Sequence, residues 1–304
     1  LVEMILCPIM WYGNPREKDM DWGQFCIMFR SLFLEGFARP FDGVRLILKK
    51  LVRKFRELGG ELKLRTGVSQ IKIDNGRAVG VVLDSGEELS GNNILSSAGA
   101  VETFKLCEAD EQLHAHTTGQ LSFVEAISTL DKYPRELGHN KTIVFFNDSE
   151  TFHWERPTED FCDLRTGVVC TPNNYCYDEK DGDLPEGVMR VTALADYERW
   201  RAVGQSDYRS QKQSWFDQVQ ASAARFVPDY RPHVIDTDMF TPHTIHRFTW
   251  HENGAVYGAT RKWLDGKTDI NNLFLCGTDQ GFVGIIGSIV SGISMANQHL
   301  LARS

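Results

Sequence analysis

The tail of the chain, residues 272–301, reads NLFLCGTDQGFVGIIGSIVSGISMANQHLL and carries the pattern that decides the fold. It predicts a short buried strand at 273–276, a loop with Gly277 and Asp279, and a helix from about Gly284 onwards, where apolar residues recur at near-helical spacing. Free backbone N–H groups and the positive end of a helix dipole meet after such a loop, so an anionic or electron-rich ligand can be held there. Close packing of helix on strand would explain the glycines equally well, and the tail alone leaves both interpretations open.

An amphipathic helix is predicted at 44–58. Apolar residues recur there at helical spacing, and lysines and arginines occupy the other face, which we interpret as solvated. Gly59 and Gly60 end the helix, because glycine adopts a left-handed turn without steric cost. A short strand is expected to follow at 61–65.

A meander of strands comes next. Residues 74–76 (DNG) predict a hairpin, because Asn-Gly tolerates the positive φ angles of a tight turn. After a further turn, a strand at 93–97 runs into a loop of small residues that includes Ala98 and Gly99. This loop is the second place where backbone could approach a ligand closely.

The middle of the chain, residues 106–246, has a different pattern. Short apolar runs alternate with polar turns, and one amphipathic helix spans about 209–226. The pattern predicts an antiparallel sheet with a covering helix, inserted as a second domain into the first. The resemblance described below implies a helical part of the substrate region at 1–42, a cofactor domain formed by 43–105 and 247–304, and the substrate domain at 106–246 between these two parts.

Composition excludes several classes of function. The chain has 304 residues and a net charge of -8, whereas a surface that binds nucleic acid needs a basic excess. Seven cysteines form no CxxC pair, and the nine histidines contain one close pair, His114 and His116, so no metal site is predicted. The longest apolar run, 281–293, is interrupted by glycines and serines and is too short to span a bilayer. We expect a cytoplasmic protein.

Residues 1–40 are rich in aromatic side chains. The favoured interpretation is a pair of core helices. The alternatives are one wall of an apolar substrate tunnel, or a surface in peripheral contact with a membrane.

Together these segments resemble the phytoene desaturase, carotenoid isomerase and retinol saturase group of flavoproteins. The run 58–71 (LGGELKLRTGVSQI) resembles the segment that precedes the meander in two-domain FAD proteins. Residues 240–245 (FTPHTI) and 253–258 (NGAVYG) resemble the group's Thr-Pro-x-Thr segment and its Gly-x-x-Tyr-Gly loop near the flavin. The spacing of the tail is closer to the retinol saturase form than to the desaturase form. The implied fold class is mixed α/β, an incomplete FAD/NAD(P)-binding-type cofactor domain with an inserted antiparallel-sheet substrate domain.

The resemblance implies FAD as the cofactor. The residues that match the cofactor-contacting motifs are Val68, Ala98, Gly99, Gly277, Asp279, Gly284, Ile285, Ile286 and Gly287. Tyr257 would lie beside the flavin ring and contact substrate. For His251 a substrate contact is the second interpretation, and a local hydrogen bond within its loop is the favoured one.

The implied activity is saturation, desaturation or isomerisation of C–C double bonds in a long apolar isoprenoid. No catalytic acid or base is assigned, because the flavin itself exchanges the hydride. Two alternatives share the fold, a flavin amine oxidase and a lipid-carrying chaperone without flavin. The flavin-facing glycines Gly284 and Gly287 argue against the chaperone.

The pyrophosphate-binding motif G-x-G-x-x-G of the group is absent from these residues. We therefore expect the chain to be the C-terminal part of a longer protein, with the missing N-terminal segment as its partner in binding FAD.

Overall fold

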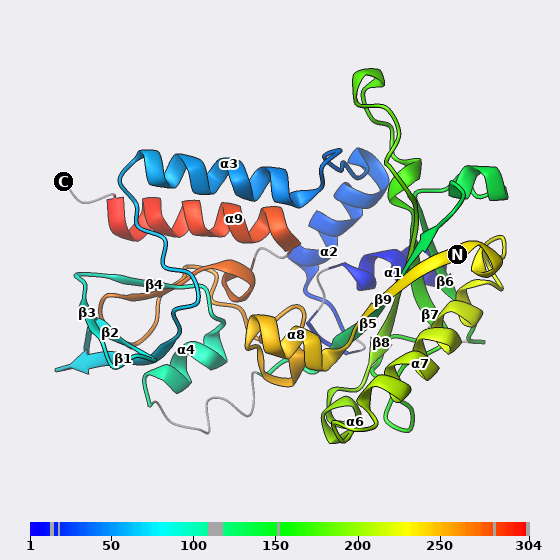
Figure 1. The fold of residues 1–304 in the computed structure, drawn as a ribbon. Helices are drawn as coiled ribbons and strands as arrows, with labels where there is room; N and C mark the ends of the chain where they lie inside the picture. The colour runs from blue at the N-terminus through cyan, green and yellow to red at the C-terminus, as the bar shows by residue number, and fades with distance from the viewer. Residues whose placement is uncertain (13–14, 18, 109–117, 151–152, 282–283, 302–304) are drawn as a thin grey trace.

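The computed structural model describes residues 1–12, 15–17, 19–108, 118–150, 153–281 and 284–301. The α-helices are α1 (Val2–Trp11), α2 (Trp22–Phe29), α3 (Val44–Glu57), α4 (Ala100–Leu106), α6 (Tyr197–Ala202), α7 (Tyr208–Ala223), α8 (Pro242–Thr249) and α9 (Gly284–Met295). The strands are β1 (Val68–Asp74), β2 (Arg77–Leu83), β3 (Glu88–Ser90), β4 (Ile94–Ser96), β5 (Ser122–Leu130), β6 (Ile143–Asn147), β7 (Thr166–Cys170), β8 (Gly187–Ala195), β9 (Val234–Phe240) and β10 (Leu273–Leu275). Figure 1 shows two lobes, with α3, α9 and β1–β4 in one and β5–β9 with α6 and α7 in the other.

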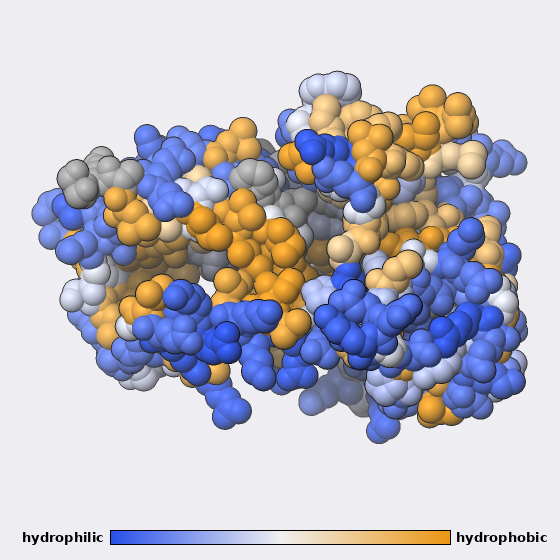
Figure 2. Space-filling view, turned by 90° about the horizontal axis from the view of Figure 1, so that it is seen from above, coloured by the Kyte–Doolittle hydropathy of each residue, from blue (hydrophilic) through white to orange (hydrophobic). Residues whose placement is uncertain are grey.

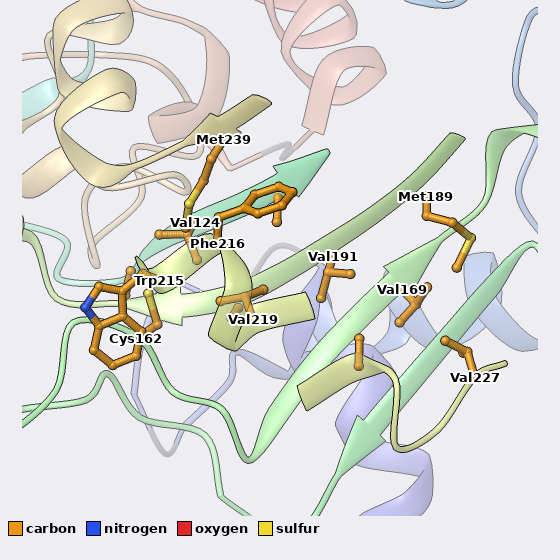
Figure 3. Close-up of a cluster of buried hydrophobic side chains, with 14 of the residues drawn as sticks. Val124, Cys162, Val169, Met189, Val191, Trp215, Phe216, Val219, Val227 and Met239 are labelled. Atoms are coloured by element: carbon orange, nitrogen blue, oxygen red, sulfur yellow. The ribbon is translucent and has the colours of Figure 1, made fainter. Parts of the chain in front are cut away.

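The second lobe is an antiparallel sheet in the order β6-β7-β8-β5-β9. Helix α7 covers one face of it, as predicted. Trp215, Phe216 and Val219 of α7 lie over Val124 and Val191 of the sheet (Figure 3), and all five side chains are buried. This core is the largest apolar cluster of the described residues, and it packs the sheet against α7.

Strand β9 was not foreseen. It lies at the edge of the sheet beside β5, and Asp236 and Asp238 on it are exposed. Charges on an edge strand discourage pairing with other chains. The two aspartates also interrupt the apolar run, which is why the sequence pattern did not predict this strand.

The first lobe contains two small sheets. β1, β2 and β3 form the expected meander, and the β1–β2 turn has positive φ at Asn75 (48°) and Gly76 (73°) as the Asn-Gly hairpin requires. β4 and β10 pair in parallel, with Leu273 opposite Ile94. Strands 179 positions apart in sequence are thus brought edge to edge, and the strand predicted in the tail is confirmed.

The strand predicted at 61–65 is wrong. The chain has no regular structure between α3 and Val68, where β1 begins. Arg65 has a φ of 56°, which is incompatible with a strand, and the apolar side chains Leu62 and Leu64 are exposed. A strand needs a partner edge, and none of the described strands reaches this segment.

The N-terminal helices are only partly core. Ile9, Met10 and Trp11 at the end of α1 are buried against the sheet face opposite α7, and the Trp11 ring lies 5.3 Å from that of Phe123. In α2 only Met28 is buried. The interpretation as two core helices therefore holds for the second half of α1. Among the described residues, no helix is both long and apolar enough to cross a bilayer.

Tyr230→Phe is expected to raise the free energy of unfolding by about 1 kcal/mol. The side chain is 1% exposed, and its hydroxyl has no hydrogen-bond partner among the described residues, so the phenol is desolvated without compensation. Chemical denaturation measures the change. Tyr257→Phe is the matched control and should lose about 1 kcal/mol, because the Tyr257 hydroxyl donates to the Trp11 carbonyl at 2.7 Å. Equal destabilisation by both changes would contradict the prediction.

Candidate functional site

The carboxyl ends of β4 and β10 lie side by side because the two strands are parallel. The Cys276 N–H donates to the Ser96 carbonyl at 2.8 Å, and the loops that follow both strands start from there. In open α/β sheets, ligands bind in the crevice outside the carboxyl ends of such strands. The structure therefore brings together four of the predicted site residues, Ala98 and Gly99 after β4 and Gly277 and Asp279 after β10.

Asp279 is the anchor between these loops. Its carboxylate is 1% exposed and accepts hydrogen bonds from the N–H of Ala100 at 2.7 Å and of Ala259 at 2.8 Å. The ammonium of Lys262 lies 3.2 Å from the same oxygen that Ala259 contacts. The prediction for Asp279, a contact with the ribityl chain of the cofactor, stays a prediction. What the structure shows is a carboxylate that ties three segments together.

Lys262 was missed by the sequence analysis. Burial lowers the pKa of its ammonium, and the charge of Asp279 and the hydrogen bond to it oppose that shift. Lys262 also donates to the Tyr257 carbonyl at 2.6 Å. A lysine between polar and aromatic neighbours carries no sequence signal for such a role, since lysines are usually solvated.

The close approach of the backbone to the Asp279 carboxylate also requires a glycine at position 258. Its φ is 65°, and a Cβ built on it would lie 2.0 Å from Oδ1 of Asp279. Only glycine fits so close to the carboxylate in this backbone conformation. The second glycine of the NGAVYG run therefore has a packing reason, which connects the loop of Tyr257 to the loop of Asp279.

Gly99 is similarly constrained. It has a φ of 108°, and an added Cβ would lie 2.1 Å from a carboxylate oxygen of Glu102 and 3.3 Å from the ring of His251. Burial raises the pKa of Glu102, and the hydrogen bond that the carboxylate accepts from the Glu252 N–H opposes the rise. Glu102 is thus a second titratable group at this loop that the sequence did not indicate.

The N-terminus of α9 is open. Gly284, Ile285 and Ile286 are exposed, and apart from its chain neighbours no atom of the described residues lies within 4 Å of a Cβ built on Gly284. Gly287, one turn on, is half-buried. The first N–H groups of a helix have no partner inside it, and its dipole is positive at that end. In Figure 1, α9 begins near the middle of the molecule, between the two lobes.

These features fit a flavin. An open helix start, a glycine with no atom near its Cβ position and exposed isoleucines form a cradle against which a flat, electron-rich ring can rest. Val68 stands apart from this cradle. It is 38% exposed at the start of β1, on the meander, and α4, the helix that follows Gly99, packs against that strand.

Tyr257 and His251 have different surroundings. Tyr257 packs with Phe123, ring centroids 5.9 Å apart, in the apolar cluster between α1 and the sheet. His251 forms a hydrogen bond within its own loop, with Nδ1 2.9 Å from the Ala255 carbonyl. Tyr257 therefore packs within an apolar cluster, and its contact with substrate stays a prediction. His251 lies beside Gly99.

No cluster of three or more potential metal ligands occurs among the described residues. The close histidine pair of the sequence, His114 and His116, lies outside them.

Comparison with known proteins gives the relatives of this chain. No family model matches it. A prolycopene isomerase of Daucus carota is 28% identical over 277 residues, which are 86% of this chain and 44% of that protein. A 4,4'-diaponeurosporene oxygenase of Staphylococcus aureus is 21% identical over 241 residues, 76% of this chain and 47% of that protein. These homologues, a carotenoid isomerase and a carotenoid oxygenase, match the phytoene desaturase-like group that the sequence resembles. The chain spans about half the length of the curated relatives that it matches.

Solved structures agree on the fold of this chain. An oxidoreductase of Methanosarcina mazei has a TM-score of 0.55 at 15% identity and covers 84% of this chain and 54% of its own. A Pyrococcus furiosus protein has a TM-score of 0.58 at 12% identity, with 98% and 63% covered. A putrescine oxidase has a TM-score of 0.54 at 14% identity, with 86% and 54% covered. The fold class predicted from the sequence is confirmed.

Proposed function

We propose that the protein containing this chain is an FAD-dependent oxidoreductase that saturates, desaturates or isomerises C–C double bonds of a long apolar isoprenoid. The observation that carries the proposal is the open, glycine-containing start of α9 at the carboxyl ends of β4 and β10. The names of the relatives, an isomerase of prolycopene and an oxygenase of diaponeurosporene, support a polyene substrate.

The FAD would be held by the backbone of the two loops and by the start of α9, through Ala98, Gly99, Gly277 and residues 284–287. Its pyrimidine end would face the partial positive charge of the helix. When bound, the cofactor supplies hydride exchange with the substrate. The residues of the chain orient the substrate and exclude water from it.

The substrate would lie along the sheet face opposite α7. Aromatic side chains line this face where α1 crosses it, and Phe123 and Tyr257 are in contact there. Lys262, bonded to the Tyr257 carbonyl and paired with Asp279, joins this wall to the loop after β10. A chain bound at Tyr257 would therefore be near the flavin cradle.

The phosphate-binding half of the site would come from another segment of the polypeptide. Among the described strands, only β10 pairs with β4, so the other edge of β4 is open to a further parallel strand. Exposed apolar side chains on α3 (Leu48, Leu51, Phe55) and α9 (Ile285, Ile286, Val290, Ile293) offer a surface for the same segment. Figure 2 shows hydrophobic residues gathered in the middle of the face seen from above.

Peripheral membrane contact is part of the proposal. Trp22 on α2, and Phe33 and Leu34 on the π-helical segment Arg30–Glu35 that continues it, are between 46% and 74% exposed. An apolar substrate dissolves in a bilayer, so an enzyme that takes it up benefits from a surface that inserts shallowly.

The test uses the full-length polypeptide that contains this chain. We expect the purified protein to show a flavin absorption spectrum. In anaerobic single-turnover incubations with carotenoid polyenes, with the flavin either oxidised or first reduced by dithionite, we expect a product changed at C–C double bonds in at least one of the two redox states. The same protein stripped of FAD is the control. A protein that binds no flavin, or one that releases hydrogen peroxide with amines and leaves polyenes unchanged, contradicts the proposal.

A further inference from the structure

Residues 36–43, the strap, connect the π-helical segment Arg30–Glu35 to α3 (Figure 1). Among the described residues, no backbone hydrogen bond ties residues 37–42 to any other part of the chain. The Gly43 N–H donates to the Pro40 carbonyl at 2.9 Å, but this bond lies within the strap itself. A segment that shares no backbone hydrogen bonds with its surroundings depends on side-chain contacts for its position, and such segments open at low energetic cost.

A glycine stands at each end of the strap. Gly36 has a φ of 78° and a ψ of −179°, and Gly43 has a φ of 70° and a ψ of −169°. This backbone conformation is adopted almost only by glycine, because any side chain would clash there. Glycine leaves it for other conformations without steric cost, so the two ends of the strap can act as hinges.

Side-chain contacts of the strap converge on Tyr177, which lies between β7 and β8. Nη1 of Arg39 donates to the Tyr177 hydroxyl at 2.6 Å, and the ring of Phe41 lies edge-on against the Tyr177 ring at 5.2 Å. The hydroxyl in turn donates to the Pro172 carbonyl at 2.8 Å, which fixes the orientation of the tyrosine. Arg39 and Tyr177 together are the latch of the strap.

The strap forms one wall of a cavity of about 550 Å³. Phe37 and Arg39 line the cavity from the strap, and Ile143 and Phe145 of β6 line it from the sheet. Apolar side chains make up most of the lining. Ile143 and Phe145 also pack against the apolar cluster that Tyr257 contacts. The cavity therefore adjoins the sheet face along which the substrate would lie.

We infer that the strap is a gate, which rotates about its two end glycines and which the bond between Arg39 and Tyr177 holds closed against the cavity. A permanent wall shares backbone hydrogen bonds with its neighbours, and among the described residues the strap shares none. The ligand that the gate admits is apolar, because the lining is mainly apolar and Nη1 of Arg39 is already bonded to Tyr177 and to the Phe41 carbonyl. The inference rests on the proposed function only for the identity of this ligand as an isoprenoid.

Tyr177→Phe tests the gate, because it removes the acceptor of the latch and keeps the ring that contacts Phe41. Loss of a hydrogen bond from a charged donor should raise the population of the open strap roughly tenfold. Stopped-flow fluorescence follows the binding of N-phenyl-1-naphthylamine, an uncharged apolar fluorophore, to the full-length protein. A gate limits entry and exit alike, so the association and dissociation rate constants should both rise roughly tenfold, with a Kd within about twofold of the wild-type value.

Two matched controls separate the gate from general effects. Tyr175 lines the same cavity, and its hydroxyl forms no hydrogen bond with another described residue, so Tyr175→Phe should leave both rate constants unchanged. Gly36→Ala disturbs the closed strap without touching the latch, because its φ of 78° disfavours a side chain, and should also raise both rate constants. Gly182→Ala, at a φ of 70° in another loop, is the control for Gly36→Ala and should change neither.

Chymotrypsin gives an independent measure, because cleavage after Phe37 or Phe41 requires the strap to leave the protein surface. Tyr177→Phe should speed these two cuts by the same factor as the rate constants and leave cuts elsewhere unchanged. Neither measurement needs flavin or turnover, so a protein that lacks flavin refutes the proposed function while the gate is still measured. Wild-type rate constants in Tyr177→Phe, a change in Kd alone, no binding of the fluorophore, or equal effects of Tyr177→Phe and Tyr175→Phe would each overturn the inference.

Discussion

Asp279→Asn is expected to lower the free energy of unfolding by roughly 3–5 kcal/mol, the usual cost of breaking a buried ion pair by removing one partner. Both carboxylate oxygens are used, Oδ2 by the Ala100 N–H and Oδ1 by the Ala259 N–H and the Lys262 ammonium. An amide has one oxygen only, so its NH₂ group must face one of these donors. Chemical denaturation of the wild-type and variant proteins measures the loss.

The same change should alter how stability depends on pH. The folded pKa of Lys262 is already lowered by burial, and removing Asp279 takes away the interaction that opposes this. Between the lowered folded pKa and the unfolded value of 10.5, the unfolded state binds more protons than the folded state, so stability rises with pH. Asp279→Asn should lower the folded pKa of Lys262 further and so extend this pH range at its acidic end. The free energy of unfolding of the variant should therefore rise more steeply towards alkaline pH than that of the wild type.

Asp178→Asn is the matched control. Asp178 pairs with Lys180 at 3.0 Å, but the two side chains are 71% and 76% exposed. An exposed pair contributes little, so a change of no more than about 1 kcal/mol is expected. If Asp279→Asn cost no more than Asp178→Asn, the anchor role of Asp279 would be wrong.

Local sequence patterns were enough to predict the secondary structure of the tail and of the β1–β2 hairpin. The strand, loop and helix of the tail follow from apolar spacing and glycine positions within thirty residues, and the Asn75–Gly76 turn follows from the dihedral angles that its residues allow. The parallel pairing of β4 with β10 was not predicted from the sequence. No local pattern contains it, because the two strands come from distant parts of the chain.

Contacts distant in sequence explain what the patterns missed. Asp279 and Ala100 are separated by 179 positions, and their hydrogen bond turns a predicted ligand contact into an anchor of the loops. Lys262 becomes part of the site only because folding buries it beside that carboxylate. The strand predicted at 61–65 failed for the converse reason, since alternating apolar residues form no strand where no described edge is available to pair with them.

Gly284→Leu is expected to weaken FAD binding by at least about 100-fold in the full-length protein, equivalent to about 2.7 kcal/mol. Apart from its chain neighbours, no described protein atom lies within 4 Å of a Cβ built on Gly284, so a leucine side chain there would start in open space and extend into the volume proposed for the flavin. Forcing a bulky group into a close-packed contact costs energy of this order. Flavin absorbance per protein after gel filtration, and titration of the stripped protein with FAD, measure the effect.

The backbone conformation of Gly284 calls for a control of its own. Its φ is 76°, so any side chain adds strain of roughly 1–2 kcal/mol to the fold, whether or not a ligand binds. Gly182, in the loop between β7 and β8, has a φ of 70° and likewise nothing within 4 Å. Gly182→Leu should therefore show the same loss of stability with full retention of FAD. Equal FAD affinity in the two variants would place the flavin elsewhere and leave the glycines of the tail to helix packing, the interpretation that the sequence alone left open.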